Sequence, residues 1–136
     1  MALQGRCLSA RERAIVAGLA DAMAAPEPPL PPVADTDAVD AVDAWLARAP
    51  ALNRIGLRAG LRLVGAGGFA QSDRAARTRR LRRIERSPLR DLIRVLAGII
   101  VIAYFGDDRA MAVLGYHPEA NLDRARRLIA EEARVG

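Results

Sequence analysis

The chain has 136 residues, a formal net charge of +5 at pH 7, and hydrophobic side chains at 51% of its positions. This length suits one domain, and the hydrophobic fraction excludes a chain that is disordered throughout, because enough apolar surface is present to form a core. The single cysteine excludes an internal disulfide. With only one histidine as well, the chain is poor in the residues that zinc sites and nucleophilic catalysis require, so we predict that it is not an enzyme.

Every cationic side chain at neutral pH is an arginine, and the arginines are unevenly distributed. Residues 21–43 contain six acidic residues and no basic one, whereas residues 74–94 contain nine arginines and two acidic residues. This separation favours ion pairing between the two segments within the fold, or pairing with a partner of mixed charge. Alanine and leucine are also abundant, which favours helix over strand.

The first predicted helix begins at Ser9, and Glu12 lies at the spacing of a capping box. Apolar residues then follow helical spacing as far as Ala25. We expect residues 1–8 to be a loose N-terminus. Residues 26–34 contain the run PEPPLPP, which cannot be helical throughout and predicts an extended, stiff connector.

Two helices are predicted after the connector. Asp35 or Asp37 caps the first of them, and Trp45 on this helix is interpreted as a core or interface anchor and not as a cofactor contact. The second helix covers residues 51–64. Its arginines recur every four residues as a solvent-facing stripe: Arg54, Arg58 and Arg62. Its apolar residues fill the rest of the circumference: Leu52, Ile55, Leu57, Leu61, Leu63 and Val64.

The run GAGG at residues 65–68 predicts a break between helices. It lacks the Gly-Lys-Ser/Thr ending of one nucleotide-binding loop and follows no predicted strand, so it is not read as a phosphate loop. Ser72 or Asp73 caps the next helix. Leu81 and Ile84 form the one apolar stripe of this helix, and arginine covers most of its remaining surface.

This arginine-covered helix carries a candidate basic face, made of Arg79, Arg82, Arg83 and Arg86. Arginines so arranged can neutralise phosphates, and residues 74–94 therefore support an alternative function in nucleic-acid binding. No aromatic residue lies among them to stack on bases, and no turn typical of a recognition helix is present. A solvated face and a surface for a protein partner are the competing interpretations.

The most apolar stretch runs from Val95 to Phe105, where the Tyr104 hydroxyl is the only polar side-chain group. Ser87 is positioned to cap a helix here, and Gly106 permits the left-handed conformation that ends many helices. The stretch is too short to span a bilayer, which takes about 20 apolar residues. A helix that is apolar on all sides must then be buried in protein.

These elements predict the fold class. Asp107 or Asp108 begins a short helix that Gly115 ends, and a further helix follows. Residues 1–136 are therefore expected to form one all-α domain, a bundle of six or seven helices around a buried central helix at residues 89–105.

Three segments in this order resemble a known family. They are LSARERAIVAGLADAM before the proline-rich break, AVDAWLARAP before a leucine-rich helix, and IAYFGDDRAMAVLGY at the end of the central helix. This order resembles the small subunits grouped with gluconate 2-dehydrogenase subunit 3, and also the helical N-terminal region of long-chain alcohol oxidases. The matching positions of the third segment are Tyr104, Phe105, Gly106, Asp107, Leu114, Gly115 and Tyr116.

The resemblance implies an accessory subunit without catalytic residues, which binds, stabilises or helps mature a large flavoprotein of the glucose–methanol–choline type. The FAD would belong to that partner, and this chain would hold no cofactor or metal. The matching residues would form either a capped helix hairpin with an aromatic core or a contact with the partner. Many such subunits carry a twin-arginine export signal, which is not seen here, so a cytosolic or membrane-peripheral complex is expected. An apolar patch should be exposed for the partner.

Overall fold

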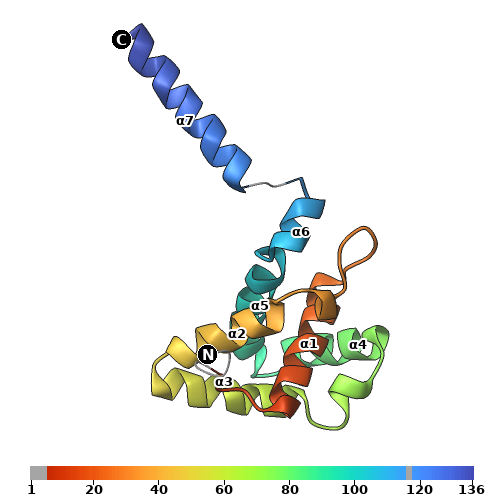
Figure 1. The fold of residues 1–136 in the computed structure, drawn as a ribbon. Helices are drawn as coiled ribbons and strands as arrows, with labels where there is room; N and C mark the ends of the chain where they lie inside the picture. The colour runs from red at the N-terminus through yellow and green to blue at the C-terminus, as the bar shows by residue number, and fades with distance from the viewer. Residues whose placement is uncertain (1–5, 116–117) are drawn as a thin grey trace.

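The computed structural model describes residues 6–115 and 118–136 (Figure 1). Over these two ranges the regular elements are seven α-helices and two short 3-10 helices, with no strand, so the predicted all-α class is confirmed. In chain order they are α1 (Ala10–Ala24), η1 (Val33–Asp35), α2 (Ala38–Arg48), α3 (Ala51–Val64), η2 (Phe69–Gln71), α4 (Arg74–Glu85), α5 (Arg90–Phe105), α6 (Asp108–Val113) and α7 (Pro118–Val135).

Two helices share the centre of the bundle. α1 and α5 pack against each other, and each of them contacts α2, α3 and α4. α5 is the helix that the sequence predicted to be central, and α1 is equally central because it contacts the same three helices. The core side chains that these two helices contribute are less than 3% exposed: Ile15, Val16 and Leu19 from α1, and Ile93, Leu96, Ile100 and Tyr104 from α5.

Polar side chains begin three of the helices as predicted. The Ser9 hydroxyl accepts a hydrogen bond from the Glu12 N–H group at 3.2 Å, the Asp73 carboxylate accepts one from the N–H three residues later at 2.7 Å, and Asp107 begins α6 in the same way. Each bond satisfies an N–H group that has no partner inside its own helix. α2 begins after Asp37, whose side chain makes no capping bond.

Both ends of α5 differ in detail from the prediction. Ser87 lies in the turn before the helix, where its hydroxyl accepts from the Leu89 N–H group at 3.2 Å, and α5 begins three residues after Ser87. At the other end Gly106 has φ −81° and ψ −7°, which is right-handed and not the left-handed conformation expected. Glycine is needed there for space, since a Cβ atom would lie 2.7 Å from the Ile102 carbonyl oxygen.

Ion pairs join α1 to α4, and they use the two charged segments that the sequence separates. Asp21 accepts hydrogen bonds from Arg74 at 2.8 Å and from Arg77 at 3.2 Å. Hydrogen bonding from Arg74 lowers the pKa of Asp21, although burial opposes this shift. The expected pairing of residues 21–43 with residues 74–94 therefore occurs within the fold at this position.

A buried carboxylate joins α1 to α3. Glu12 is fully buried, and its carboxylate accepts two hydrogen bonds of 2.8 Å from Arg58 and one of 3.3 Å from Arg62. The hydrogen bonds from Arg58 lower the pKa of Glu12 to about 2. Arg58 and Arg62 were expected to be a solvent-facing stripe: Arg62 is exposed as expected, with 64% of its side chain accessible, whereas Arg58 is 34% exposed, and both bind this carboxylate at the edge of the core.

The segment before α1 is anchored at Cys7 and Leu8, where a loose terminus was expected. The Asp43 carboxylate on α2 accepts hydrogen bonds from the Cys7 N–H group at 2.7 Å and the Leu8 N–H group at 3.1 Å, and it also pairs with Arg13 at 2.6 Å. Burial raises the pKa of the Cys7 thiol, so this cysteine is held in its neutral form.

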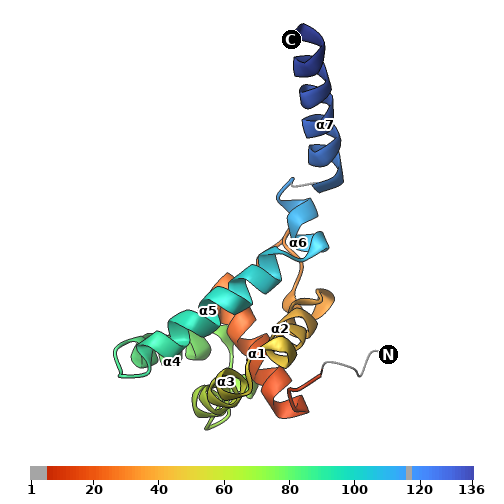
Figure 2. The same ribbon diagram turned by 90° about the vertical axis from the view of Figure 1, so that its left-hand side faces the viewer.

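Helix α7 stands apart from the bundle. Figures 1 and 2 both show it extending away from the other helices beyond α6. Gly115, with φ +77°, ends the short helical segment before it, as the sequence predicted. From residue 122 to the end of the chain every side chain is exposed, and the buried hydrophobic side chains of the described residues all lie between Leu8 and Ala110.

Candidate functional site

The two faces of α5 have different surroundings although both are apolar. One face is in the core, whereas on the other Val95 is 52% exposed and Ile102 is 74% exposed. A Cβ atom added at Gly98, between them, would meet no described atom within 4 Å. The expectation that this helix is buried on all sides is therefore wrong, because the bundle leaves the side that carries Val95, Gly98 and Ile102 uncovered.

This exposed face forms one wall of a groove. The other wall is α2, from which Ala41, Val42 and Trp45 line the groove, and the groove has a volume of about 510 Å³. Trp45 is the only tryptophan in the chain and is 48% exposed here. Arg94 is the only charged residue that lines the groove, so the surface offers apolar contact with one cation at its border.

The chemistry of the groove suits the binding of an apolar segment and not a reaction. Its lining residues include no carboxylate, histidine, cysteine or hydroxyl group. Within residues 6–115 and 118–136 no group of three or more metal-binding side chains comes together. An exposed aromatic residue beside aliphatic side chains is typical of a surface that becomes buried against another protein.

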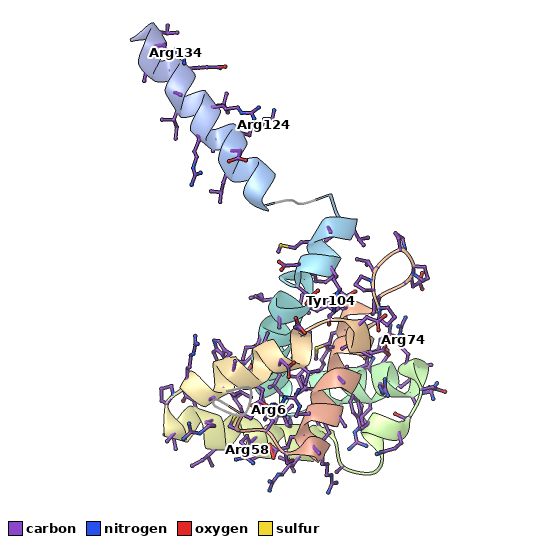
Figure 3. The ribbon with its side chains drawn as sticks, viewed as in Figure 1. Arg6, Arg58, Arg74, Tyr104, Arg124 and Arg134 are labelled. Carbon is purple, nitrogen blue, oxygen red and sulfur yellow. The ribbon has the colours of Figure 1, made fainter. Side chains whose placement is uncertain are left out.

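The structure places the residues of the resemblance motif mainly at structural positions. Tyr104 is fully buried, and its hydroxyl donates a 2.7 Å hydrogen bond to the Pro31 carbonyl of the proline-rich connector (Figure 3). Phe105 packs edge-on against Tyr104, with ring centroids 5.0 Å apart. Tyr104 therefore fastens the connector at residues 26–34 to the end of α5 and is not available at the surface.

Asp107 joins two helix starts. One carboxylate oxygen accepts from the Arg109 N–H group at 3.0 Å, and the other accepts from the Asp37 N–H group at 2.9 Å. The Arg109 guanidinium also donates to the Asp35 carbonyl. This junction ties the start of α2 to the segment between α5 and α6.

The last residues of the motif follow α6, at the end of the bundle from which α7 extends. Leu114 is 59% exposed, and Gly115 follows it. Tyr116 lies outside the described residues, as does His117. The motif therefore contributes one exposed leucine, Leu114, which does not line the groove.

The candidate basic face divides into two parts. Arg79 and Arg83 line a second hollow of about 460 Å³ together with Arg80, near Gly67 and Gly68. Arg82 and Arg86 are exposed but do not line this hollow. Among the other arginines of this helix, Arg74 and Arg77 are committed to Asp21. The cationic surface is consequently smaller than the sequence suggests.

A third exposed surface lies on α3, where the sequence prediction was also wrong. Leu52, Ile55 and Leu63 were expected to belong to the apolar circumference outside the solvent-facing arginine stripe, and each is more than half exposed. Ile55 and Leu63 border Arg58 and Arg62, which hold Glu12. This surface is thus broken by two charges, whereas the groove between α2 and α5 is continuous.

A comparison of the chain with family models, with curated proteins and with solved structures found no match. What the structure defines is the class of protein, a small helical bundle with an exposed apolar groove and a projecting C-terminal helix. None of the described helices has the length and apolarity that crossing a bilayer requires.

Proposed function

We propose that the protein is a non-catalytic accessory subunit that binds a larger protein partner through the groove between α2 and α5. The observation that carries this proposal is the exposure of Trp45, Val95 and Ile102 on one continuous surface. Leaving these side chains in water is unfavourable, because each side chain of this kind gains about 1.5–3 kcal/mol when it is fully buried. A partner that covers the groove recovers this free energy.

The resemblance described above supports the identity of the partner as a flavin-dependent alcohol, sugar or steroid-type oxidoreductase. In this proposal the FAD and the redox chemistry belong to the large subunit, and this chain stabilises that subunit or assists its maturation. The complex is cytosolic or peripheral to a membrane.

Nucleic-acid binding through residues 74–94 is the alternative, and the hollow lined by Arg79, Arg80 and Arg83 is the observation in its favour. The pairing of Arg74 and Arg77 with Asp21 counts against it, because those two charges are already neutralised. Binding of this kind weakens steeply as salt concentration rises, which separates it from binding at an apolar groove.

The test is an affinity pull-down of the tagged chain from its native cell extract, with an absorbance scan of the eluate. The groove variant is Ile102→Asp, and Leu52→Asp is its matched control, because Leu52 is an exposed leucine outside the groove. We expect flavin absorbance and one large protein with the wild-type chain and with Leu52→Asp, and at least a tenfold loss of both with Ile102→Asp.

Two results would contradict the proposal. One is retention of the flavoprotein by Ile102→Asp at the wild-type level, because the groove would then not be the binding surface. The other is recovery of nucleic acid that is released at high salt and lost when Arg79 and Arg83 are changed to Gln, which would establish the alternative.

A further inference from the structure

Helix α7 carries an apolar stripe that nothing in its own bundle covers. The helical spacing of Leu122, Leu128 and Ile129 places them on one side of α7. Each of the three side chains is more than half exposed. Alanines at positions 125 and 133 extend the same side. The opposite side of α7 carries charged residues. Figure 3 shows two of the α7 arginines, Arg124 and Arg134, far from the bundle.

One acidic residue interrupts this apolar stripe. Glu132 lies three and four residues after Ile129 and Leu128, so it occupies the same side of the helix one turn further on. Glu131, its neighbour in sequence, points to the charged side. The stripe of α7 is therefore a row of apolar side chains with Arg126 at its edge, one turn after Leu122, and a single anion, Glu132, toward its C-terminal end.

The groove between α2 and α5 has the complementary pattern. It is a row of apolar side chains with a single cation, Arg94, at the end nearer the start of α5. From residue 94 to residue 103 the groove follows α5 for about 14 Å, and from residue 122 to residue 132 the stripe follows α7 for about 15 Å, at 1.5 Å per residue. In an antiparallel arrangement Glu132 meets Arg94 while Leu122 meets Ile102.

We propose that the α7 helix of a second copy of this chain occupies the groove between α2 and α5. α7 extends away from its own bundle in both views, so the groove that it is placed to reach is that of another molecule (Figures 1 and 2). Each copy has one groove and one α7. A reciprocal exchange about a two-fold axis therefore fills both grooves and leaves neither stripe exposed.

This dimer does not depend on the identity of the large partner, since it requires only the purified chain. It does use the surface assigned above to that partner, and a partner that binds the groove displaces α7. A dimer that fails to form leaves the pull-down experiment unaffected, so the two proposals can fail separately.

The test is the mass of the purified full-length chain in solution, measured by light scattering after size-exclusion chromatography across a range of concentrations. Trp45 is the only tryptophan and lies in the groove, so its emission reports directly on whether the groove is covered. We expect a concentration-dependent shift from monomer to dimer, accompanied by a blue shift of the Trp45 emission as the side chain leaves water.

Charge exchange tests the orientation of α7 in the groove. Glu132→Arg and Arg94→Glu each place like charges together and should raise the dimer dissociation constant about tenfold or more, whereas the double variant should restore it. The matched control is Glu131→Arg, which makes the same change of charge on the other side of α7 and should change the dissociation constant less than about twofold.

A chain that stays monomeric at all concentrations overturns the proposal, whether α7 is free, occupies its own groove, or binds anionic lipid vesicles instead. A dimer that Glu131→Arg weakens as much as Glu132→Arg, or that the double variant fails to restore, also overturns it, because the two charges would then not meet.

Discussion

The two sides of α5 are almost equally apolar in sequence but have opposite environments in the fold. The closed side carries Ile100 and Tyr104, which are 1% and 0% exposed and pack toward α1. The open side carries Val95 and Ile102, which face water across the groove toward α2. The comparison teaches that apolar content alone does not distinguish a core from a docking surface, because both remove hydrocarbon from water.

The closed and open sides of α5 also differ in how the polar groups near them are paired. On the closed side the buried Glu12 carboxylate is bound by Arg58 and Arg62, and every buried polar side-chain atom of the described residues has a hydrogen-bond partner. On the open side Arg94 is 3.9 Å from Asp91, and both side chains are mostly exposed. The closed side is covered by the chain itself, whereas the open side is exposed.

The largest expected effect comes from removing the same atoms on the two sides of α5. Ile100→Ala should lower the free energy of unfolding by about 3 kcal/mol, because it leaves a cavity in the core. Ile102→Ala should change it by less than about 0.5 kcal/mol in the monomer, because this side chain is already in water. Urea unfolding of the two variants measures the difference. Equal destabilisation would show that the two faces are not distinct.

The next largest effect concerns the buried carboxylate. The pKa of Glu12 is lowered to about 2 from an ordinary value of 4.5, so the stability that it contributes is present above pH 4.5 and is lost as the pH falls toward 2. Glu12→Gln should therefore lower the free energy of unfolding by about 2 kcal/mol at pH 6 and should have much less effect near pH 2. Urea unfolding at several pH values measures this.

The exposed pair on the open side is the matched control for Glu12. Asp91→Asn removes the partner of Arg94 on α5 but should cost less than about 0.5 kcal/mol, because both groups remain solvated. A loss comparable to that of Glu12→Gln, or a loss for Glu12→Gln that does not change with pH, would remove the electrostatic distinction between the two sides.

An effect smaller than that of Glu12→Gln is expected at the contact between α5 and the proline-rich connector. Tyr104→Phe removes the hydroxyl that donates to the Pro31 carbonyl and should cost about 1 kcal/mol, because the carbonyl loses its partner. Trp45 lies on α2, across the groove from α5. Its exposed fraction should be unchanged in this variant, as measured by quenching of its fluorescence. A red or blue shift of Trp45 emission in this variant would mean that the connector, and not the α5–α6 junction alone, sets the groove.

The sequence predicted the helices well because their signals are local. Capping by Ser9 and Asp73 depends on residues three positions apart, and the break at residues 65–68 depends on glycine. It failed where a residue depends on a distant partner. The burial of Glu12 requires two arginines more than 40 residues away, and nothing near it in sequence indicates them.

The groove between α2 and α5 was only partly predictable, because it combines a local signal with a contact between distant segments. A helix in a bundle needs one apolar stripe for its core, so a helix that is apolar on all sides signals a second covered surface. The sequence therefore predicted that Val95 and Ile102 are covered, whereas the structure exposes both, and it did not predict that α2 and Trp45 form the other wall of a groove. That juxtaposition is long-range: the Asp37 N–H group before α2 bonds to Asp107 after α5, 70 residues away.

The central claim is that the open side of α5 is a docking surface for a protein partner. The most direct measurement is the pull-down from native extract with the wild-type chain, Ile102→Asp and Leu52→Asp side by side. We predict a flavin-containing large protein with the wild-type chain and with Leu52→Asp, and its loss with Ile102→Asp. Equal recovery with all three chains, or a well-folded wild-type chain that recovers no flavoprotein, would contradict it.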